Sequence, residues 1–146
     1  MATIKKFEDL EIWKLSREMS KNVYLLTFKD EFSKDFGLKD QIRRSSGSVM
    51  DNIAEGFGRG GNKEFTNFLT YSVASCNEVE SQLYRAIDNE YISKEEFDFC
   101  YELCEKIISK TGSFIRYLNE SNIKGIKYNN RVNELEIRYG NYEDEC

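Results

Sequence analysis

The stretch "GFGRGG", residues 56–61, is the part of the sequence that most closely matches a binding motif. Gly56, Gly58 and Gly61 fit G-x-G-x-x-G, which holds the phosphates of a dinucleotide when it follows a β-strand. Here the preceding residues repeat their apolar positions with a helical period, and no Gly-Lys-Ser/Thr follows for a P-loop. We therefore interpret the stretch as a turn between two helices, with Gly56 or Gly58 ending the first in a left-handed conformation.

The same turn could attract an anion without any nucleotide fold. The N-terminus of the following helix presents backbone amides beside Arg59 and Lys63, and this combination favours a negative group such as a phosphate of RNA or DNA. Arg43 and Arg44, in the preceding helix, extend the set. The candidate anion- or nucleic-acid-binding residues are Arg43, Arg44, Arg59 and Lys63.

Polar residues also occur inside the two helices that flank this turn. An antiparallel pairing would bring Glu78 and Glu80 opposite Arg43 or Arg44. Two interpretations stay open: a structural network that fixes helix register, or a ligand site shared with the arginines. Two carboxylates could act as acid and base, but nothing specifies a substrate, so we expect no enzyme and no cofactor. The polar network comprises Gln41, Asn52, Glu55, Glu78 and Glu80.

Histidine is absent from the sequence, which excludes Ser-His-Asp and Cys-His catalysis and removes the commonest metal ligand. Cys100 and Cys104 lie four residues apart on one helical face, but a metal would need two more soft ligands at fixed distances. We therefore expect buried, reduced cysteines in the core and no metal site.

Composition indicates one soluble domain. The chain has 146 residues, of which 40% are hydrophobic and 32% charged, and its net charge is -5. This balance argues against a strongly basic nucleic-acid binder but allows a local basic patch. No apolar run could span a bilayer and the N-terminus lacks the apolar core of a signal peptide, so we expect a cytoplasmic protein without membrane contact.

Four segments with helical periodicity must position the candidate residues: about 8–28, 37–56, 63–88 and 94–119. Their connections are short, which forces neighbouring helices to run antiparallel. No proline interrupts them. The sequence therefore predicts an all-α fold over residues 1–119, an antiparallel up-down-up-down four-helix bundle with a polar C-terminal tail.

Two helix starts carry capping signals. Ser93 and Glu96, in "SKEE", form a capping box, and Asn62 is placed to cap the third helix. The tail, 120–146, has no helical period, and we expect it to be flexible or packed on a neighbouring subunit.

The first segment has apolar residues on more than one face. One apolar stripe would face the bundle. The remaining apolar residues would be exposed unless another subunit covered them, which favours a homo-oligomer. A bundle that buries its first helix unusually deeply is the alternative.

These motifs together resemble a known family. Phe7, Leu10 and Trp13 match the opening F-x-x-L-x-x-W of the four-helix-bundle proteins encoded within intervening sequences of bacterial large-subunit (23S) ribosomal RNA genes. "GLKDQIRRSSGSVMDNIAEGFGR" matches the family's central signature, and "SVASCNEVESQL" matches its third helix. The resemblance covers about residues 7–118.

The resemblance implies an antiparallel four-helix bundle assembled as a ring-like homopentamer, in a family sometimes grouped with ribosomal proteins. A more distant similarity links the chain to the accessory protein of diversity-generating retroelements, a pentameric barrel that binds nucleic acid and reverse transcriptase. Our leading hypothesis is therefore a non-enzymatic, oligomeric bundle that binds RNA or a ribonucleoprotein. A protein–protein interaction scaffold with no nucleic-acid role is the alternative.

Overall fold

The computed structural model describes residues 4–123, with side chains as far as Ser121, and this range is built from helices and their connections. A 3-10 turn, η1, precedes the first long helix. The predictions for the tail lie outside the described residues, except that 120–123 continue the last helix. The elements are η1 (Phe7–Asp9), α1 (Glu11–Leu26), α2 (Asp30–Lys34), α3 (Phe36–Gly58), α4 (Asn62–Asp88) and α5 (Lys94–Ile123).

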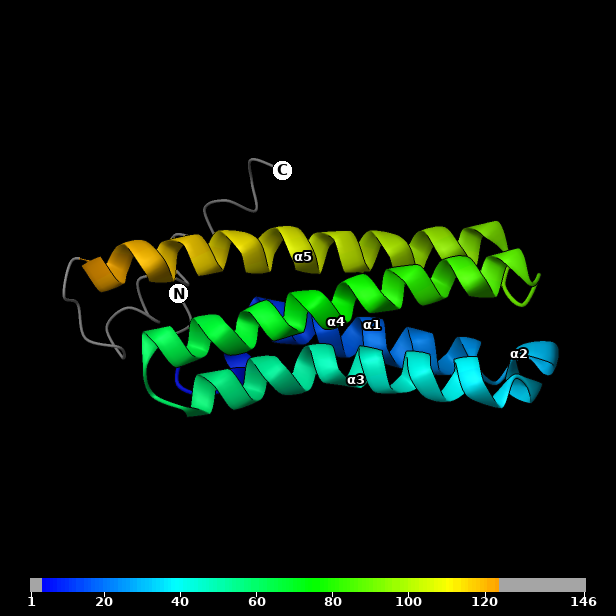
Figure 1. Ribbon diagram of the computed structural model, residues 1–146, viewed down its shortest axis with the longest axis horizontal. Coiled ribbons are helices and arrows are strands. Elements are labelled where there is room, and N and C mark those ends of the chain that lie inside the picture. Colours follow the sequence, from blue (N-terminus) through cyan, green and yellow to red (C-terminus); the bar gives the residue numbers. More distant parts are fainter. Residues whose placement is uncertain (1–3, 124–146) are drawn as a thin grey trace.

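The four long helices lie side by side along one direction (Figure 1). Helix α1 packs against α3 and α5, and α4 packs against the same two helices from the other side. The predicted all-α antiparallel four-helix bundle is confirmed. It forms because each long helix carries an apolar stripe at helical spacing that is buried against its neighbours.

The core has two parts along the bundle axis. The larger cluster lies toward α2 and includes Met19, Phe32, Ile42 and Leu83. The smaller cluster lies at the end with the α3–α4 turn and is held by Phe65 and its neighbours, with the Phe65 and Phe114 ring centroids 5.5 Å apart. Both clusters are shared by several helices, so each fixes how the helices approach one another.

Helix α2 lies in a segment for which the sequence predicts only a loop. Its single buried residue, Phe32, stacks on Tyr91 with 5.3 Å between ring centroids. The Tyr91 hydroxyl donates to Asp35 Oδ2 at 3.0 Å, and Asp35 Oδ1 accepts from the backbone amide of Leu38 to cap α3. The aromatic contact of Phe32 and the cap formed by Asp35 thus order this segment. With five residues, it is too short to show a periodic apolar pattern in the sequence.

The helix ends confirm one capping prediction and overturn another. Ser93 and Glu96 form the expected capping box, with backbone-to-side-chain bonds of 2.8 and 3.1 Å. Asn62 is not a cap. It is the first residue inside α4, and Gly61 occupies the cap position without a side-chain bond.

The glycine assignment in the α3–α4 turn is also wrong. The left-handed residue is Gly60, with φ of 82°, whereas Gly56 stays helical and buried. A Cβ on Gly56 would lie 2.6 Å from Phe68 Cβ, so this glycine lets α3 and α4 approach closely.

Candidate nucleic-acid interface

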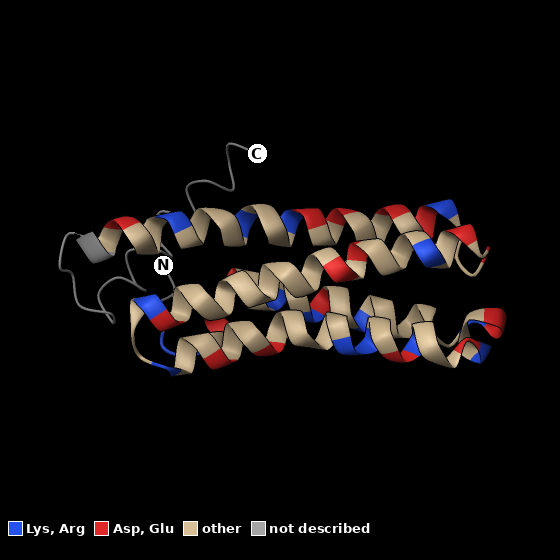
Figure 2. Ribbon diagram, viewed as in Figure 1, with Lys and Arg blue, Asp and Glu red and all other residues tan. Residues whose placement is uncertain are grey.

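The turn between α3 and α4 places two of the candidate cations at one end of the bundle. Arg59 follows the last residue of α3, and Lys63 lies in the first turn of α4. Figure 2 shows basic segments on both sides of this turn. No side chain caps the α4 N-terminus, and Lys63 has no ion pair within residues 4–123. The positive end of the helix dipole is therefore open beside two cations.

Arg59 contacts a carboxylate on α3 and an aromatic ring on α4. Its Nη2 lies 2.8 Å from Glu55 Oε1, and its guanidinium carbon is 5.2 Å from the centroid of the Phe68 ring. Half of the side chain remains exposed. Such an exposed ion pair contributes about 0–1 kcal/mol to stability. It therefore orients the Arg59 side chain but is weak enough for the guanidinium to bind another anion.

Asn62 is a buried polar residue at the same end. Among residues 4–123, neither Oδ1 nor Nδ2 of its side chain has a hydrogen-bond partner, and the hydroxyl of Thr66, one turn further along α4, is also buried without one. Buried amides normally have partners, so these two residues make the start of α4 unusually polar for a packed helix.

Arg43 and Arg44 are adjacent in sequence but have different surroundings. The Arg43 guanidinium lies 4.2 Å from the Tyr24 ring centroid and 5.0 Å from that of Phe28, and its Nε donates to Thr27 Oγ1. Arg44 is 80% exposed and pairs with Asp40 at 2.9 Å. Arg43 therefore stabilises packing against the end of α1, and only Arg44 remains available at the surface.

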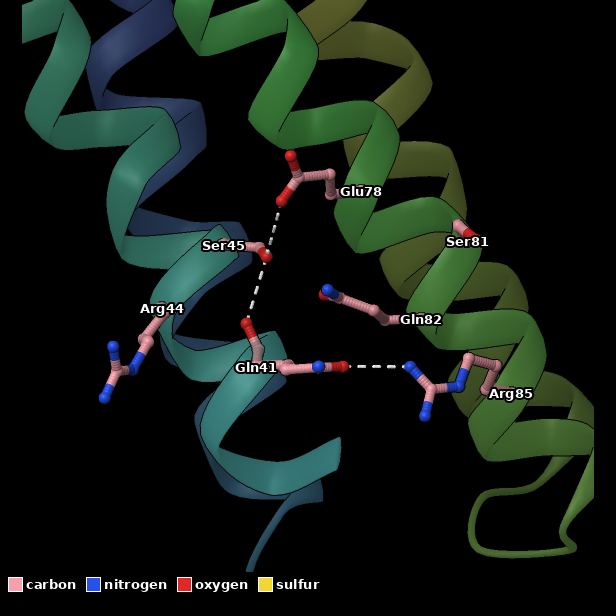
Figure 3. A pocket seen from close by; sticks show the side chains of 7 residues that line it. All are labelled: Gln41, Arg44, Ser45, Glu78, Ser81, Gln82 and Arg85. Atoms are coloured by element: carbon pink, nitrogen blue, oxygen red, sulfur yellow. Dashed lines mark hydrogen bonds between the residues drawn. The ribbon is translucent and has the colours of Figure 1, made fainter. Parts of the chain in front are cut away.

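A groove lies between α3 and α4, with a cavity volume of about 360 Å³. Two hydrogen bonds cross it: Arg85 Nη1 donates to Gln41 Oε1 at 2.9 Å, and Ser45 Oγ donates to Glu78 Oε2 at 3.2 Å (Figure 3). We call this feature the α3–α4 groove; its lining residues are Gln41, Arg44, Ser45, Glu78, Ser81, Gln82 and Arg85.

The side chains that line the α3–α4 groove point in different directions. Gln82 extends into the space between the two helices, whereas Arg44 runs away from it toward solvent (Figure 3). The Oε1 atom of Gln82 is buried and has no hydrogen-bond partner in the part of the chain that the structure describes. The groove therefore holds one unused acceptor at its centre and a cation at its rim.

The expected pairing of glutamates with arginines is only partly realised. Glu78 lines the same groove as Arg44, but its hydrogen bond is to Ser45, and no ion pair joins Glu78 to either arginine in the described part of the chain. Glu80 lies on the other side of α4, toward α5, so the prediction that it faces Arg43 or Arg44 is wrong. Two residues along a helix turn a side chain by about 200°, which places the pair on different faces.

Glu80 is buried beside a second carboxyl group. Burial and a hydrogen bond with Glu105 raise the pKa of Glu80 to about 7, and its Oε2 has no hydrogen-bond partner among the described residues. The charge of Glu80 in turn raises the pKa of Tyr101 to about 12. This arrangement disfavours the charged form of Glu80 in the α4–α5 contact.

The remaining residues of the predicted polar network, Asn52 and Glu55, bind side chains or carbonyls one turn away on the chain. Asn52 Nδ2 donates to the carbonyl and the hydroxyl of Ser48, and Ser48 Oγ lies 2.8 Å from Ser75 Oγ on α4. Glu55 pairs with Arg59. The five predicted network residues are thus distributed among separate contacts along the bundle and do not form one cluster.

Sequence reasoning missed Gln82 and Arg85 as groove residues. The signal was present, because Glu78, Gln82 and Arg85 follow the i, i+4, i+7 spacing of one helical face. That face is polar, so no apolar stripe marks it in the sequence.

The three cysteines within the described residues lie in the core, as predicted for Cys100 and Cys104. Cys76, Cys100 and Cys104 are buried free thiols, and burial raises the pKa of Cys100 to about 11. Within residues 4–123, no group of three or more His, Cys, Asp or Glu side chains could hold a metal ion. No helix in this range is long and apolar enough to cross a membrane.

Comparison with known proteins identifies related sequences and a related fold. The family model described as 23S rRNA-intervening sequence protein matches residues 8–113. A crystal structure from Bacteroides thetaiotaomicron VPI-5482, described as a protein with unknown function from the S23 ribosomal protein family, is 26% identical with a TM-score of 0.66. The alignment covers 71% of this chain and 97% of that one. No curated protein is significantly similar.

Proposed function

We propose that this chain, which belongs to the 23S rRNA-intervening sequence protein family, is a non-catalytic, oligomeric helical-bundle protein that binds RNA or a ribonucleoprotein. One observation carries the proposal. Arg59 and Lys63 flank the uncapped N-terminus of a 27-residue helix at an exposed end of the bundle. A phosphate there would meet two cations and the positive end of the helix dipole.

The exposed cations of α3 and of the α3–α4 turn are available to phosphates, with Arg44 toward the α2 end of α3 and Arg59 just after the last residue of α3. Within residues 4–123, the ion pairs of Arg44 and Arg59 are with carboxylates on α3, and such exposed pairs are weak enough to be exchanged. The contact set is therefore Arg44, Arg59 and Lys63. Arg43, the fourth predicted cation, is assigned to packing against Tyr24 and Phe28.

Although the net charge is -5, assembly can gather the basic residues into one surface. A ring of subunits would place one α3–α4 turn from each chain around a common axis and so concentrate a few cations into one basic face. The homopentamer implied by the family resemblance would do this. The distant similarity to the pentameric retroelement accessory protein, noted from the sequence alone, would imply the same arrangement.

Gel shifts with structured ribosomal RNA fragments at low salt test the proposal. We expect wild-type protein to shift the RNA and Arg59→Glu to bind at least tenfold more weakly, because a phosphate contact becomes a repulsion. Lys94→Glu is the matched control: Lys94 also pairs at i, i+4, with Asp98, and also lies over an aromatic ring, but on α5. No shift at low salt, or equal binding by the two variants, would overturn the proposal.

Exposed apolar side chains on α1 and just beyond it support the oligomer. Tyr24, Leu25 and Phe28 are 43%, 57% and 66% exposed, which is the excess predicted from the sequence. Light scattering should report an assembly for the wild type and a smaller species for Leu25→Glu. A monomeric wild type would refute this part.

The same apolar surface favours the second candidate function, a protein–protein scaffold without a nucleic-acid role. A partner protein recovered by pull-down after nuclease treatment, together with absent RNA binding, would favour it over the RNA-binding proposal. Failure of Leu25→Glu to recover that partner would locate the contact on α1.

A further inference from the structure

We propose that the α3–α4 groove holds an unpaired guanine base of the bound RNA. This inference rests on the proposed RNA-binding function and deepens it, because phosphate contacts at the α3–α4 turn carry no sequence information whereas a base in the groove would. The groove lies between the two helices that this turn connects.

The size and lining of the groove suit a small hydrogen-bonding group. Its volume of about 360 Å³ falls within the range of about 300–1,000 Å³ typical of small-ligand sites. All seven lining side chains are polar or charged. A ligand held there must therefore exchange hydrogen bonds with the walls and not merely fill apolar space.

The groove offers unused acceptors. Ser45 is the one donor to the carboxylate of Glu78 among the described contacts, so an ionised Glu78 keeps lone pairs on both oxygens. Gln82 Oε1 is buried, lacks a donor and belongs to a side chain that extends between the helices (Figure 3). Ligand N–H groups would satisfy both residues.

Donors lie along the same groove. Arg85 uses Nη1 to bind Gln41, and a guanidinium has five N–H donors, so others remain for a ligand carbonyl or phosphate. Arg44, at the rim, is exposed and could contact the phosphate of a bound nucleotide. The groove therefore combines a carboxylate and an amide oxygen with nearby guanidinium donors.

Guanine fits this combination better than the other bases. Its Watson–Crick edge has two adjacent donors, N1–H and the 2-amino group, which match the two oxygens of a carboxylate, and its O6 and N7 accept from arginine. Adenine, cytosine and uracil each place an acceptor next to their single donor on that edge, and the acceptor would face the carboxylate of Glu78. Guanine is thus the base that Glu78 and Arg85 can recognise together.

Fluorescence anisotropy with matched RNA strands tests the inference. The probes are short uridine-rich single strands that carry one guanosine or, at the same position, inosine, which lacks the 2-amino group. We expect wild-type protein to bind the guanosine strand about tenfold more tightly, as for one well-placed bidentate contact. Glu78→Gln should bind both strands alike, because its amide N–H groups face guanine donors.

The control variant is Glu102→Gln, which makes the same charge change at an exposed position on α5 and should keep the preference. Glu78 is exposed, so Glu78→Gln should fold normally, as checked by circular dichroism. Binding of RNA without a guanosine preference, or a preference that survives Glu78→Gln, would overturn the inference alone. Failure of both strands and of the structured ribosomal fragments to bind at low salt would overturn the proposed function and the inference with it.

Discussion

Glu78 and Glu80 lie two residues apart on α4 and have opposite surroundings. Glu78 faces α3, is exposed, and accepts a hydrogen bond from Ser45. Glu80 faces α5, is buried, and has the carboxyl of Glu105 as its neighbour. Burial and the neighbouring Glu105 carboxyl raise the pKa of Glu80, whereas Glu78 lies at the surface beside a hydroxyl donor.

The two sides of α4 differ in the same way along their length. Toward α3, serine hydroxyls make short bonds: Ser72 Oγ donates to the Val49 carbonyl at 2.7 Å, and Ser48 meets Ser75. Toward α5, the contact is mainly apolar, and its polar groups include Glu80, a weak bond from Cys76 Sγ to the Cys104 carbonyl, and a hydrogen bond between Tyr84 and Tyr101. The α3 side can therefore present a polar groove without buried charge, and it is the side suited to bind a ligand.

Substitution of Gly56 should have the largest effect on the α3–α4 contact. Gly56→Ala would place a methyl 2.6 Å from Phe68 Cβ, and overpacking of this kind destabilises by about 1–3 kcal/mol. Gly47→Ala, on the same helix, meets no atom within 4 Å and should stabilise by about 0.5–1 kcal/mol. Urea unfolding of the two variants measures both effects. Equal destabilisation would mean that the helices are not in close contact at Gly56.

A pH titration of stability should separate Glu80 from Glu78. The pKa of Glu80 is about 7 in the folded protein, against an ordinary value of 4.5, so folding is progressively disfavoured as pH rises from about 4.5 to about 7. Glu80→Gln should remove this loss and stabilise the protein at neutral pH, on the order of 1–2 kcal/mol. Thermal melts at several pH values measure it.

The control for that titration is Glu78→Gln, which should change stability by less than about 0.5 kcal/mol at every pH, as expected for an exposed side chain. If Glu78→Gln and Glu80→Gln give the same pH profile, the two glutamates do not have the different surroundings described above.

Loss of a serine hydrogen bond between α4 and α3 should have a smaller effect on stability. Ser72→Ala removes a buried hydrogen bond to Val49 and should destabilise by about 1 kcal/mol. Ser81→Ala, at an exposed position of the same helix, should be neutral within about 0.5 kcal/mol. Chemical denaturation checks the difference. A neutral Ser72→Ala would show that the polar contacts on this side do not stabilise the helix pair.

The bundle could be predicted because its signals are local. Apolar positions recur at helical spacing over four long segments, and Ser93 and Glu96 are close enough in sequence for their capping box to be recognised. Helix α2 could not be found in this way. It depends on Phe32 stacking against Tyr91, a residue far along the chain, and no local pattern encodes that contact.

The candidate site was harder to predict because it depends on which way each side chain leaves its helix. The sequence placed Arg43 and Arg44 together as cations, but aromatic rings from the end of α1 draw Arg43 into packing. Asn62 was expected as a cap by residue type, whereas the chain enters α4 one residue earlier. Gln82 and Arg85 line a groove because α3 packs opposite their polar face of α4, and the sequence does not show which helix lies there.

The salt dependence of RNA binding tests most directly whether the α3–α4 turn contacts phosphate. The affinity of wild-type protein and of the double variant Arg59→Gln, Lys63→Gln for one structured ribosomal RNA fragment should be measured across a range of salt concentrations. We expect a steep negative slope of log affinity against log salt for the wild type, and a slope shallower by about 0.7–0.9 for each phosphate that the variant no longer neutralises. Identical slopes for the two proteins would contradict the assignment of Arg59 and Lys63 as phosphate-binding residues.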